Sequence, residues 1–211
     1  MKKNKVLAVI GICILMVAGC VLSFGEKPEY EGLEKAEEVG QSLQEAANSL
    51  ADSDSENTLI RIIGDGIEQD VSEEYFSVRV ALWKAYGASD PVGSAIDSMK
   101  TEALEKAFAE KQGLTPTKME INEYVKSMRE EIQSDEESSA IVEELLQTIG
   151  FSQDYYWDEY KPRYEAPAAL THLKVSDYIV VNGLEKIDPS RADYEVIDKE
   201  AFEEIRNHYT M

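Results

Sequence analysis

The chain has few of the residues on which nucleophilic and metal chemistry depend. Both of its cysteines, Cys13 and Cys20, lie within the first twenty of the 211 residues, and its two histidines are His172 and His208. Beyond Cys20 the sequence offers no disulfide, no thiol nucleophile and no cysteine metal site. Two histidines so far apart are more typical of surface or packed positions than of a catalytic base or metal pair. We therefore expect no cofactor and no metal ion.

Basic residues are also scarce. The chain has 21 lysines and arginines against 42 aspartates and glutamates, which gives a formal net charge of -21. This balance argues against nucleic acid as a partner, because binding to phosphate requires a basic surface. Hydrophobic residues nevertheless make up 43% of the chain. That share is typical of a folded, helix-rich body rather than of a disordered one.

The sequence lacks the common catalytic motifs. It contains no Gly-rich phosphate loop, no GxSxG and no HExxH. Its acidic residues are dispersed along predicted helix faces, which is typical of a solvated surface. The sequence pattern alone pairs no two carboxylates for glycoside hydrolysis. We therefore expect a protein that is not an enzyme and has no catalytic residues.

The N-terminus predicts a membrane segment. Lys2, Lys3 and Lys5 precede an uncharged run of nineteen residues, Val6–Phe24. A helix of that length just crosses a hydrocarbon core of about 30 Å. Lysines before such a segment stay on the cytoplasmic side. We therefore expect the body after Phe24 to lie on the extracytoplasmic face of the cell membrane.

Two interpretations of this leader remain open. Val17, Ala18, Gly19 and Cys20 resemble a bacterial lipobox, in which the signal peptide is cleaved before a cysteine that is then lipidated. The apolar run, however, continues beyond Cys20 to Phe24, which favours an uncleaved transmembrane helix. Both interpretations predict a body that is tethered to the membrane.

Hydrophobic spacing and capping residues predict a mainly α-helical body with a short β-prone segment at Thr58–Ile63. A polar helix is expected over Gly32–Ala51, where it serves either as a stalk or as an element packed lightly on the body. Further helices are expected from Ser72 to Gly87, from Asp90 to Gly113, from Thr115 onward, over Asp135–Thr148, from Ser152 to a stop or kink at Pro162, over Pro167–Ile179 and over Lys199–His208.

Aromatic residues are concentrated between Gly150 and Pro167. The six are Phe151, Tyr155, Tyr156, Trp157, Tyr160 and Tyr164. They are either core anchors or the lining of a groove for another polypeptide. On an α-helix, Tyr155 and Trp157 point about 200° apart. At least one member of the trio that they form with Tyr156 must therefore face away from a single core.

Two sequence phrases resemble the N-terminal chaperone domain of the SurA and PrsA type. One is AEKQGLTPTKMEI, Ala109–Ile121, which in that family joins two core helices; the other is GFSQDYYW, Gly150–Trp157. The resemblance covers about residues 60–179. It implies an elongated, multi-helix, peptide-binding domain related to trigger factor. The residues after Ile179 are too few for the parvulin domain that such proteins often carry, so we expect no prolyl-isomerase activity.

The sequence thus predicts four regions: an anchor or lipoprotein signal at 1–24, a stalk and linker at 25–57, a SurA-like peptide-binding domain at 58–180 and a C-terminal extension at 181–211. The expected function is non-catalytic binding of unfolded or exported polypeptides. The alternative is a structural or interaction subunit with one fixed partner in an envelope complex. The side chains expected to contact peptide are Phe76, Val80, Trp83, Tyr124, Tyr155, Tyr156, Trp157 and Tyr160.

Overall fold

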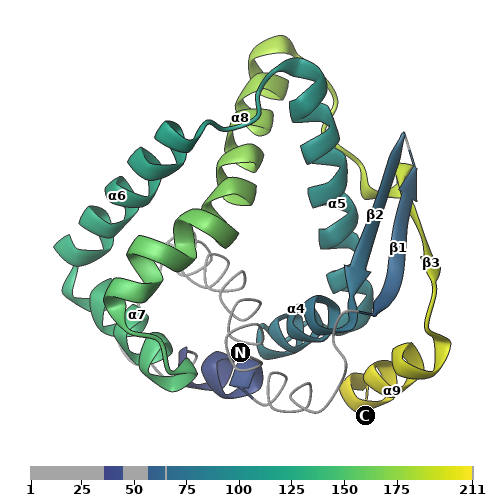
Figure 1. Cartoon of the computed structure of the whole chain (residues 1–211), viewed down its shortest axis with the longest axis horizontal. Coiled ribbons are helices and arrows are strands. Elements are labelled where there is room, and N and C mark those ends of the chain that lie inside the picture. The colour runs from purple at the N-terminus through teal and green to yellow at the C-terminus, as the bar shows by residue number, and fades with distance from the viewer. Residues whose placement is uncertain (1–35, 45–56, 65, 211) are drawn as a thin grey trace. The chain divides into compact units, whose positions relative to one another are not determined.

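The computed structural model describes residues 36–44, 57–64 and 66–210, and within them the fold is mainly helical with a small three-stranded sheet (Figure 1). The predicted mainly α class is thus confirmed. Besides a helix at 36–44, the elements are β1 (Thr58–Gly64), β2 (Ile67–Ser72), α4 (Glu73–Ala85), α5 (Pro91–Gln112), α6 (Lys118–Ser134), α7 (Glu136–Ile149), the π-helix η2 (Tyr155–Glu165), α8 (Ala166–Asn182), the 3-10 helix η3 (Pro189–Arg191), β3 (Asp193–Val196) and α9 (Lys199–Thr210).

The predicted membrane leader, including Cys20, lies outside the described residues. Among those that are described, no helix combines the length and the apolar character needed to cross a bilayer.

Side-chain caps fix where the helices begin, as the sequence predicts. The side chains of Ser72 before α4, Asp90 before α5 and Asp135 before α7 each accept a hydrogen bond from the backbone N–H three residues later. The distances are 3.2, 2.9 and 2.7 Å, respectively. Each bond satisfies an amide that the first helical turn leaves without a partner. The helix α6 begins at Lys118, so Pro116 precedes it rather than occupying its first turn.

The chain divides into two compact units. Unit 2 comprises residues 54–117 and 168–211, and it holds the whole sheet, in the order β2-β1-β3. Both pairings are antiparallel, and Ile60 is opposite Val71 on one side and Val196 on the other. The region 181–211, expected as an extension, is instead part of this unit, because it supplies β3 and α9.

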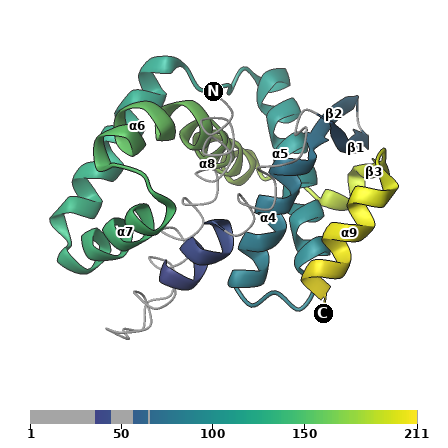
Figure 2. The same ribbon diagram turned by 60° about the horizontal axis from the view of Figure 1, so that its bottom comes forward.

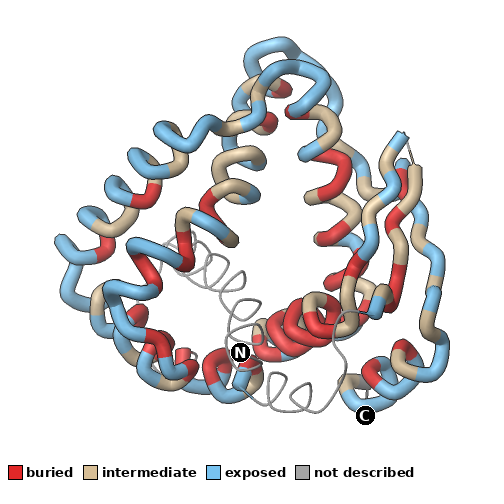
Figure 3. Tube along the Cα trace, viewed as in Figure 1, coloured by how far each residue is buried: buried red, intermediate tan, exposed pale blue. Residues whose placement is uncertain are grey.

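The core of unit 2 lies between the sheet and three helices. It includes Ile60 and Ile62 of β1, Met99 of α5 and Phe202 of α9. The helix α9 packs alongside α4 (Figure 2), where the rings of Phe76 and Phe202 lie 5.4 Å apart. A smaller cluster joins α5 to α8. Figure 3 shows that α4 is buried along most of its length.

Unit 1 comprises residues 1–53 and 118–167, of which 36–44 and 118–167 are described. The helix at 36–44 packs on α7, because a Cβ built on Gly40 would lie 2.7 Å from Thr148. Val39 and Leu43 of the same helix are fully buried. The described part of the expected stalk is therefore a packed element of unit 1.

Pro162 does not end the fifth helix, as one form of the prediction had it, because helix continues from Gln153 through Pro162 into α8. Proline has no amide hydrogen, and its ring clashes with the carbonyl of the preceding turn of an α-helix. Here the turn is wider: Tyr155–Glu165 form a π-helix, in which bonds join residues five apart. The N–H of Ala166, for example, donates to the carbonyl of Lys161.

Candidate functional site

Three of the aromatic residues expected to contact peptide form the interior of unit 1. Tyr156, Trp157 and Tyr160 expose 1%, 2% and 0% of their surface. The rings of Tyr156 and Tyr160 stack with centroids 6.2 Å apart, and the indole N–H of Trp157 donates to Gln153 at 2.8 Å. In this structure these three side chains offer no surface to a peptide, so the core interpretation of the cluster holds for them.

Tyr155 and Tyr124 have different surroundings. Tyr155 is 39% exposed, and its ring meets that of Phe151 edge to face at 5.1 Å. The expectation that one of Tyr155, Tyr156 and Trp157 must face away from the core is thus confirmed. Tyr124, on α6, is half-buried, and burial raises the pKa of its hydroxyl, with a further contribution from the carboxylate of Glu165.

A buried polar triad lies among these aromatic rings. Lys161 and Glu165 are 0% and 1% exposed, with 3.5 Å between Nζ and Oε2. Lys161 Nζ donates to the hydroxyl of Tyr156, which donates to Glu165 Oε2, each at 3.0 Å. Burial raises the pKa of Glu165 to about 7, although the charge of Lys161 opposes this shift. Burial also lowers the pKa of Lys161, and the carboxylate of Glu165 opposes that shift.

The wider turn of the π-helix explains how this triad assembles. Tyr156 and Glu165 are nine residues apart, which in an α-helix is about 2.5 turns and puts them on opposite faces. In a π-helix the same nine residues make about two turns, so both side chains lie on one face. The triad is enclosed on all sides, and it has a structural rather than a ligand-binding geometry.

In unit 2 the residues of α4 expected to contact peptide are also mostly buried. Phe76 and Val80 are 0% exposed and belong to the main core. Trp83 is half-buried against the same core, and its indole N–H lies 3.4 Å from Ser98 Oγ. The broad apolar face of α4 therefore packs inside the protein and does not form an open groove.

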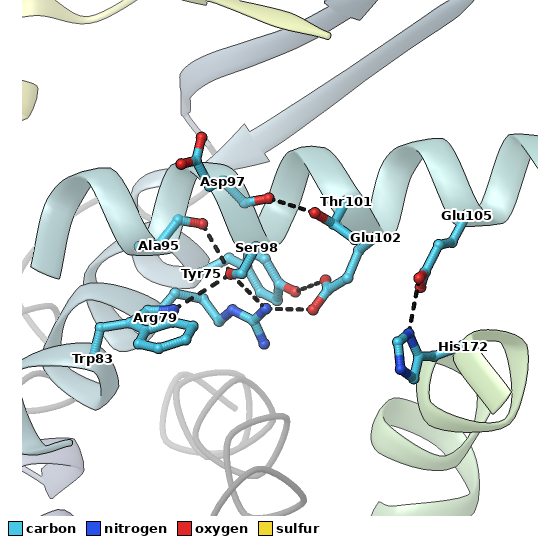
Figure 4. Close-up of polar contacts among 10 residues, drawn as sticks. All are labelled: Tyr75, Arg79, Trp83, Ala95, Asp97, Ser98, Thr101, Glu102, Glu105 and His172. Carbon is cyan, nitrogen blue, oxygen red and sulfur yellow. Dashed lines mark hydrogen bonds and ion pairs between the residues drawn. The ribbon is translucent and has the colours of Figure 1, made fainter. Parts of the chain in front are cut away.

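A charged network joins α4 to α5 beside that core (Figure 4). The guanidinium of Arg79, whose side chain is 3% exposed, forms an ion pair with Glu102 and donates to Ser98 Oγ at 2.9 Å. Tyr75 donates its hydroxyl to Glu102 at 2.9 Å. The network pairs a buried charge with hydrogen-bond partners, which is what its burial requires.

A second polar contact in Figure 4 joins α8 to α5 within unit 2. His172 Nδ1 lies 2.8 Å from Glu105 Oε1. The hydrogen bond to Glu105 raises the pKa of His172, although partial burial opposes the shift. The exposed imidazole and the buried carboxylate thus hold the two helices together most firmly when the histidine is protonated.

The helix α8 carries exposed apolar residues on one side. Leu173, Val180, Val181 and, just beyond the helix, Leu184 expose 45%, 77%, 83% and 47% of their surface. We call these four residues the α8 patch. Leu173 and Val180 are seven residues apart and share one face, because seven residues make about two helical turns. The opposite face of α8 buries Val175 and Ile179 against Ala109 of α5.

Sequence reasoning missed the α8 patch, although the chain carries a signal for it. Ile179, Val180 and Val181 are consecutive apolar residues, and three consecutive positions on a helix cover too wide an arc to face one core. The same argument predicts that at least one of Tyr155, Tyr156 and Trp157 faces away from the core. Applied to residues 179–181, it predicts that at least one of Ile179, Val180 and Val181 is exposed.

Unit 2 also contains a pocket of about 350 Å³, between α5, the start of β2 and the chain that follows α8. Five apolar residues line it: Ile67, Leu104, Ala107, Phe108 and Ile187. The other two lining residues, Lys111 and Arg191, are basic and exposed. Ile187 also packs against the cluster that joins α5 to α8. One wall of the pocket is therefore in contact with the helix that carries the α8 patch.

The chain matches no protein-family model, and no similar curated protein or solved structure was found. The likeness to SurA- and PrsA-type chaperones therefore remains a hypothesis from the two sequence phrases. Across the described parts of the chain, no group of three or more His, Cys, Asp or Glu side chains is arranged to hold a metal ion.

Proposed function

We propose that this protein is a membrane-tethered, extracytoplasmic polypeptide-binding protein of the SurA/PrsA chaperone type, which holds unfolded or exported chains without covalent chemistry. The α8 patch is the observation that carries the proposal. A helix that is apolar on two sides is normally covered on both. Here one side packs on α5, whereas Val180 and Val181 are 77% and 83% exposed.

The α8 patch has the chemistry of a weak, general contact. Burying a valine or leucine side chain contributes about 1.5–3 kcal/mol, before the cost of ordering both partners. Four such residues support reversible, micromolar binding rather than a permanent complex. Apolar contact is not screened by salt, so binding through the α8 patch should change little between low and physiological ionic strength.

An aggregation assay tests this function. The full chain, held in lipid nanodiscs, is added to a client that unfolds on reduction or heating, and light scattering follows client aggregation. We expect the parent protein to suppress aggregation of several unrelated clients. The double variant Val180→Ser/Val181→Ser should require at least about five times more protein for the same effect, because about 1 kcal/mol or more of apolar contact is lost.

Ile197→Ser provides the matched control. Ile197 is 48% exposed in the same unit, but it lies between β3 and α9 in the chain and is not part of the α8 patch. This variant should protect clients as well as the parent does. If the parent protects no client, or if the double valine variant protects equally well, the proposal is wrong. Protection or capture of one protein alone would favour the alternative, a subunit with one fixed partner.

The membrane tether is tested separately on cells. Protease added to intact spheroplasts should digest the body beyond Phe24, whereas complete protection would contradict the extracytoplasmic location. Cys20→Ser distinguishes the two forms of anchor that the leader allows. Loss of lipid labelling and of processing supports the lipobox, and an unchanged apparent mass supports the uncleaved helix.

A further inference from the structure

The pocket in unit 2 has an unusual charge for this protein. The chain carries two acidic residues for every basic one, yet the two charged residues that line the pocket, Lys111 and Arg191, are both basic. The remaining five lining residues are apolar. Arg191 also interacts with the carboxylate of Asp188, whereas Lys111 is exposed and forms no ion pair among the described residues.

We infer that this pocket binds the C-terminal residue of a polypeptide, with an apolar side chain inside and the free α-carboxylate on Lys111 and Arg191. This inference rests on the proposed function and names the part of a client that unit 2 recognises. The ligand needs one apolar group to contact Leu104 and Phe108. It also needs one negative charge at the rim, where ammonium and guanidinium groups recognise carboxylates.

Size and chemistry both favour a chain terminus. A volume of about 350 Å³ is at the lower end of the range for small-molecule sites, so it accommodates one or two residues rather than a folded surface. An internal aspartate or glutamate carries its carboxylate on its own side chain, so the apolar group has to come from a second residue. A terminal leucine, valine or phenylalanine presents both groups from one residue.

The position of the pocket along the chain agrees with this inference. Leu184 of the α8 patch precedes Ile187 of the pocket by three residues. Ile187 contacts both the pocket and the α5–α8 cluster. A polypeptide whose last residue occupies the pocket can therefore place its preceding apolar residues along α8. The α8 patch would supply general affinity, and the pocket would supply a preference for free C-termini.

Matched peptides test the inference. Fluorescein-labelled ten-residue peptides that end in leucine, either as the free acid or as the amide, are titrated with the full chain in lipid nanodiscs, and anisotropy gives Kd. We expect the free acid to bind at least tenfold more tightly than the amide. Raising the salt concentration should reduce this ratio, because the preference is ionic and the charges are exposed. Equal Kd values would overturn the inference.

Lys111→Gln should remove most of the preference for the free acid and leave binding of the amide unchanged. Lys106→Gln is the control, since Lys106 is an exposed lysine of α5 that does not line the pocket; it should keep the preference. A preference that survives Lys111→Gln would overturn the assignment. Both substitutions are at exposed positions, and circular dichroism confirms that each variant is folded.

The same titrations separate this inference from the proposed function. If both peptides bind with equal affinity and Val180→Ser/Val181→Ser weakens both, the chaperone function stands and the pocket assignment fails. If neither peptide binds, both fail. N-acetyl-leucine is the small-acid probe. If it displaces the free-acid peptide but not the amide peptide, the result supports the pocket assignment. Binding of N-acetyl-leucine without any peptide binding would identify a small-molecule site and overturn the inference.

Discussion

Tyr155 and Trp157 are two positions apart, yet one is at the surface and the other in the core. The exposed fraction is 39% for Tyr155 and 2% for Trp157. Trp157→Ala should lower the free energy of unfolding by about 3–5 kcal/mol, because it leaves a large cavity. Tyr155→Ala should cost about 1 kcal/mol or less. Urea denaturation followed by circular dichroism measures both values; a similar loss for the two variants would contradict this burial pattern.

Glu165 makes stability depend on pH near neutrality. Its pKa is about 7 in the folded protein, against 4.5 for an ordinary glutamate, because burial disfavours its charge. The folded state therefore binds this proton more tightly than the unfolded state does. The stability that the proton contributes is complete below about pH 4.5 and is lost as pH rises through 7.

The comparison of parent and Glu165→Gln isolates this effect. Relative to Glu165→Gln, the unfolding free energy of the parent should fall by up to about 3 kcal/mol from pH 4.5 to pH 7.5. Each pKa unit corresponds to about 1.4 kcal/mol. Glu143→Gln, at an exposed position of α7, is the control and should show no such trend. A parent–variant difference that stays constant over this pH range would exclude the role assigned to Glu165.

At the scale of elements, Gly64 allows the end of β1 to pack closely against the backbone of the segment before β3. Its φ is 143°, and an added Cβ would lie 2.7 Å from the carbonyl oxygen of Arg191 and 2.9 Å from Cα of Ala192. Both neighbours are backbone atoms, which cannot rotate away as a side chain can. Gly64→Ala should therefore cost about 3 kcal/mol or more, from backbone strain and from displacement of the segment before β3.

Gly66→Ala is the matched substitution. Gly66 has a φ of 82°, but an added Cβ would meet nothing within 4 Å. This variant should cost about 1–2 kcal/mol, the usual penalty for a side chain in a left-handed conformation. Thermal unfolding of the two variants provides the comparison. Equal midpoints would show that the contact with Arg191 and Ala192 is unimportant.

The elements that could be predicted from the sequence are those with local signals. Ser72, Asp90 and Asp135 mark helix starts because each side chain accepts a bond from an amide three residues ahead. Local rules did not predict that helix continues past Pro162, because they describe an α-helix and the chain instead forms a π-helix that contains the buried Lys161 and Glu165. That outcome depends on tertiary burial, which a rule about proline alone does not include.

The candidate site was less predictable than the fold. Aromatic content at Tyr156, Trp157 and Tyr160 suggested a binding groove, but large rings also gain the most from burial. Exposure depends on which neighbours cover a residue, and sequence spacing does not specify them. The run Ile179–Val181 indicates that one of its residues is exposed, but only the packing of Ile179 on α5 shows that Val180 and Val181 are the exposed ones.

For the whole molecule, the sequence-based boundary at residue 180 should not delimit a fragment that folds on its own. A fragment 58–180 lacks β3, which pairs with β1, and α9, which places Phe202 and Ile205 in the core. We expect this fragment to show no cooperative unfolding transition. A fragment 58–211 should unfold cooperatively in its sheet-containing unit. Circular dichroism during urea titration compares them, and a cooperative transition in the shorter fragment would refute the assignment of β3 and α9 to unit 2.

The pairing of β1 with β3 has a consequence for how the protein is made. Ile60 pairs with Val196, so β1 leaves the ribosome long before its partner strand exists. At about 5–20 residues per second, the intervening chain takes on the order of ten seconds to synthesise. During that interval one edge of β1 has no partner strand, and an unpaired edge is a template for aggregation. We therefore expect the nascent chain to need protection of this edge from aggregation until β3 has been synthesised.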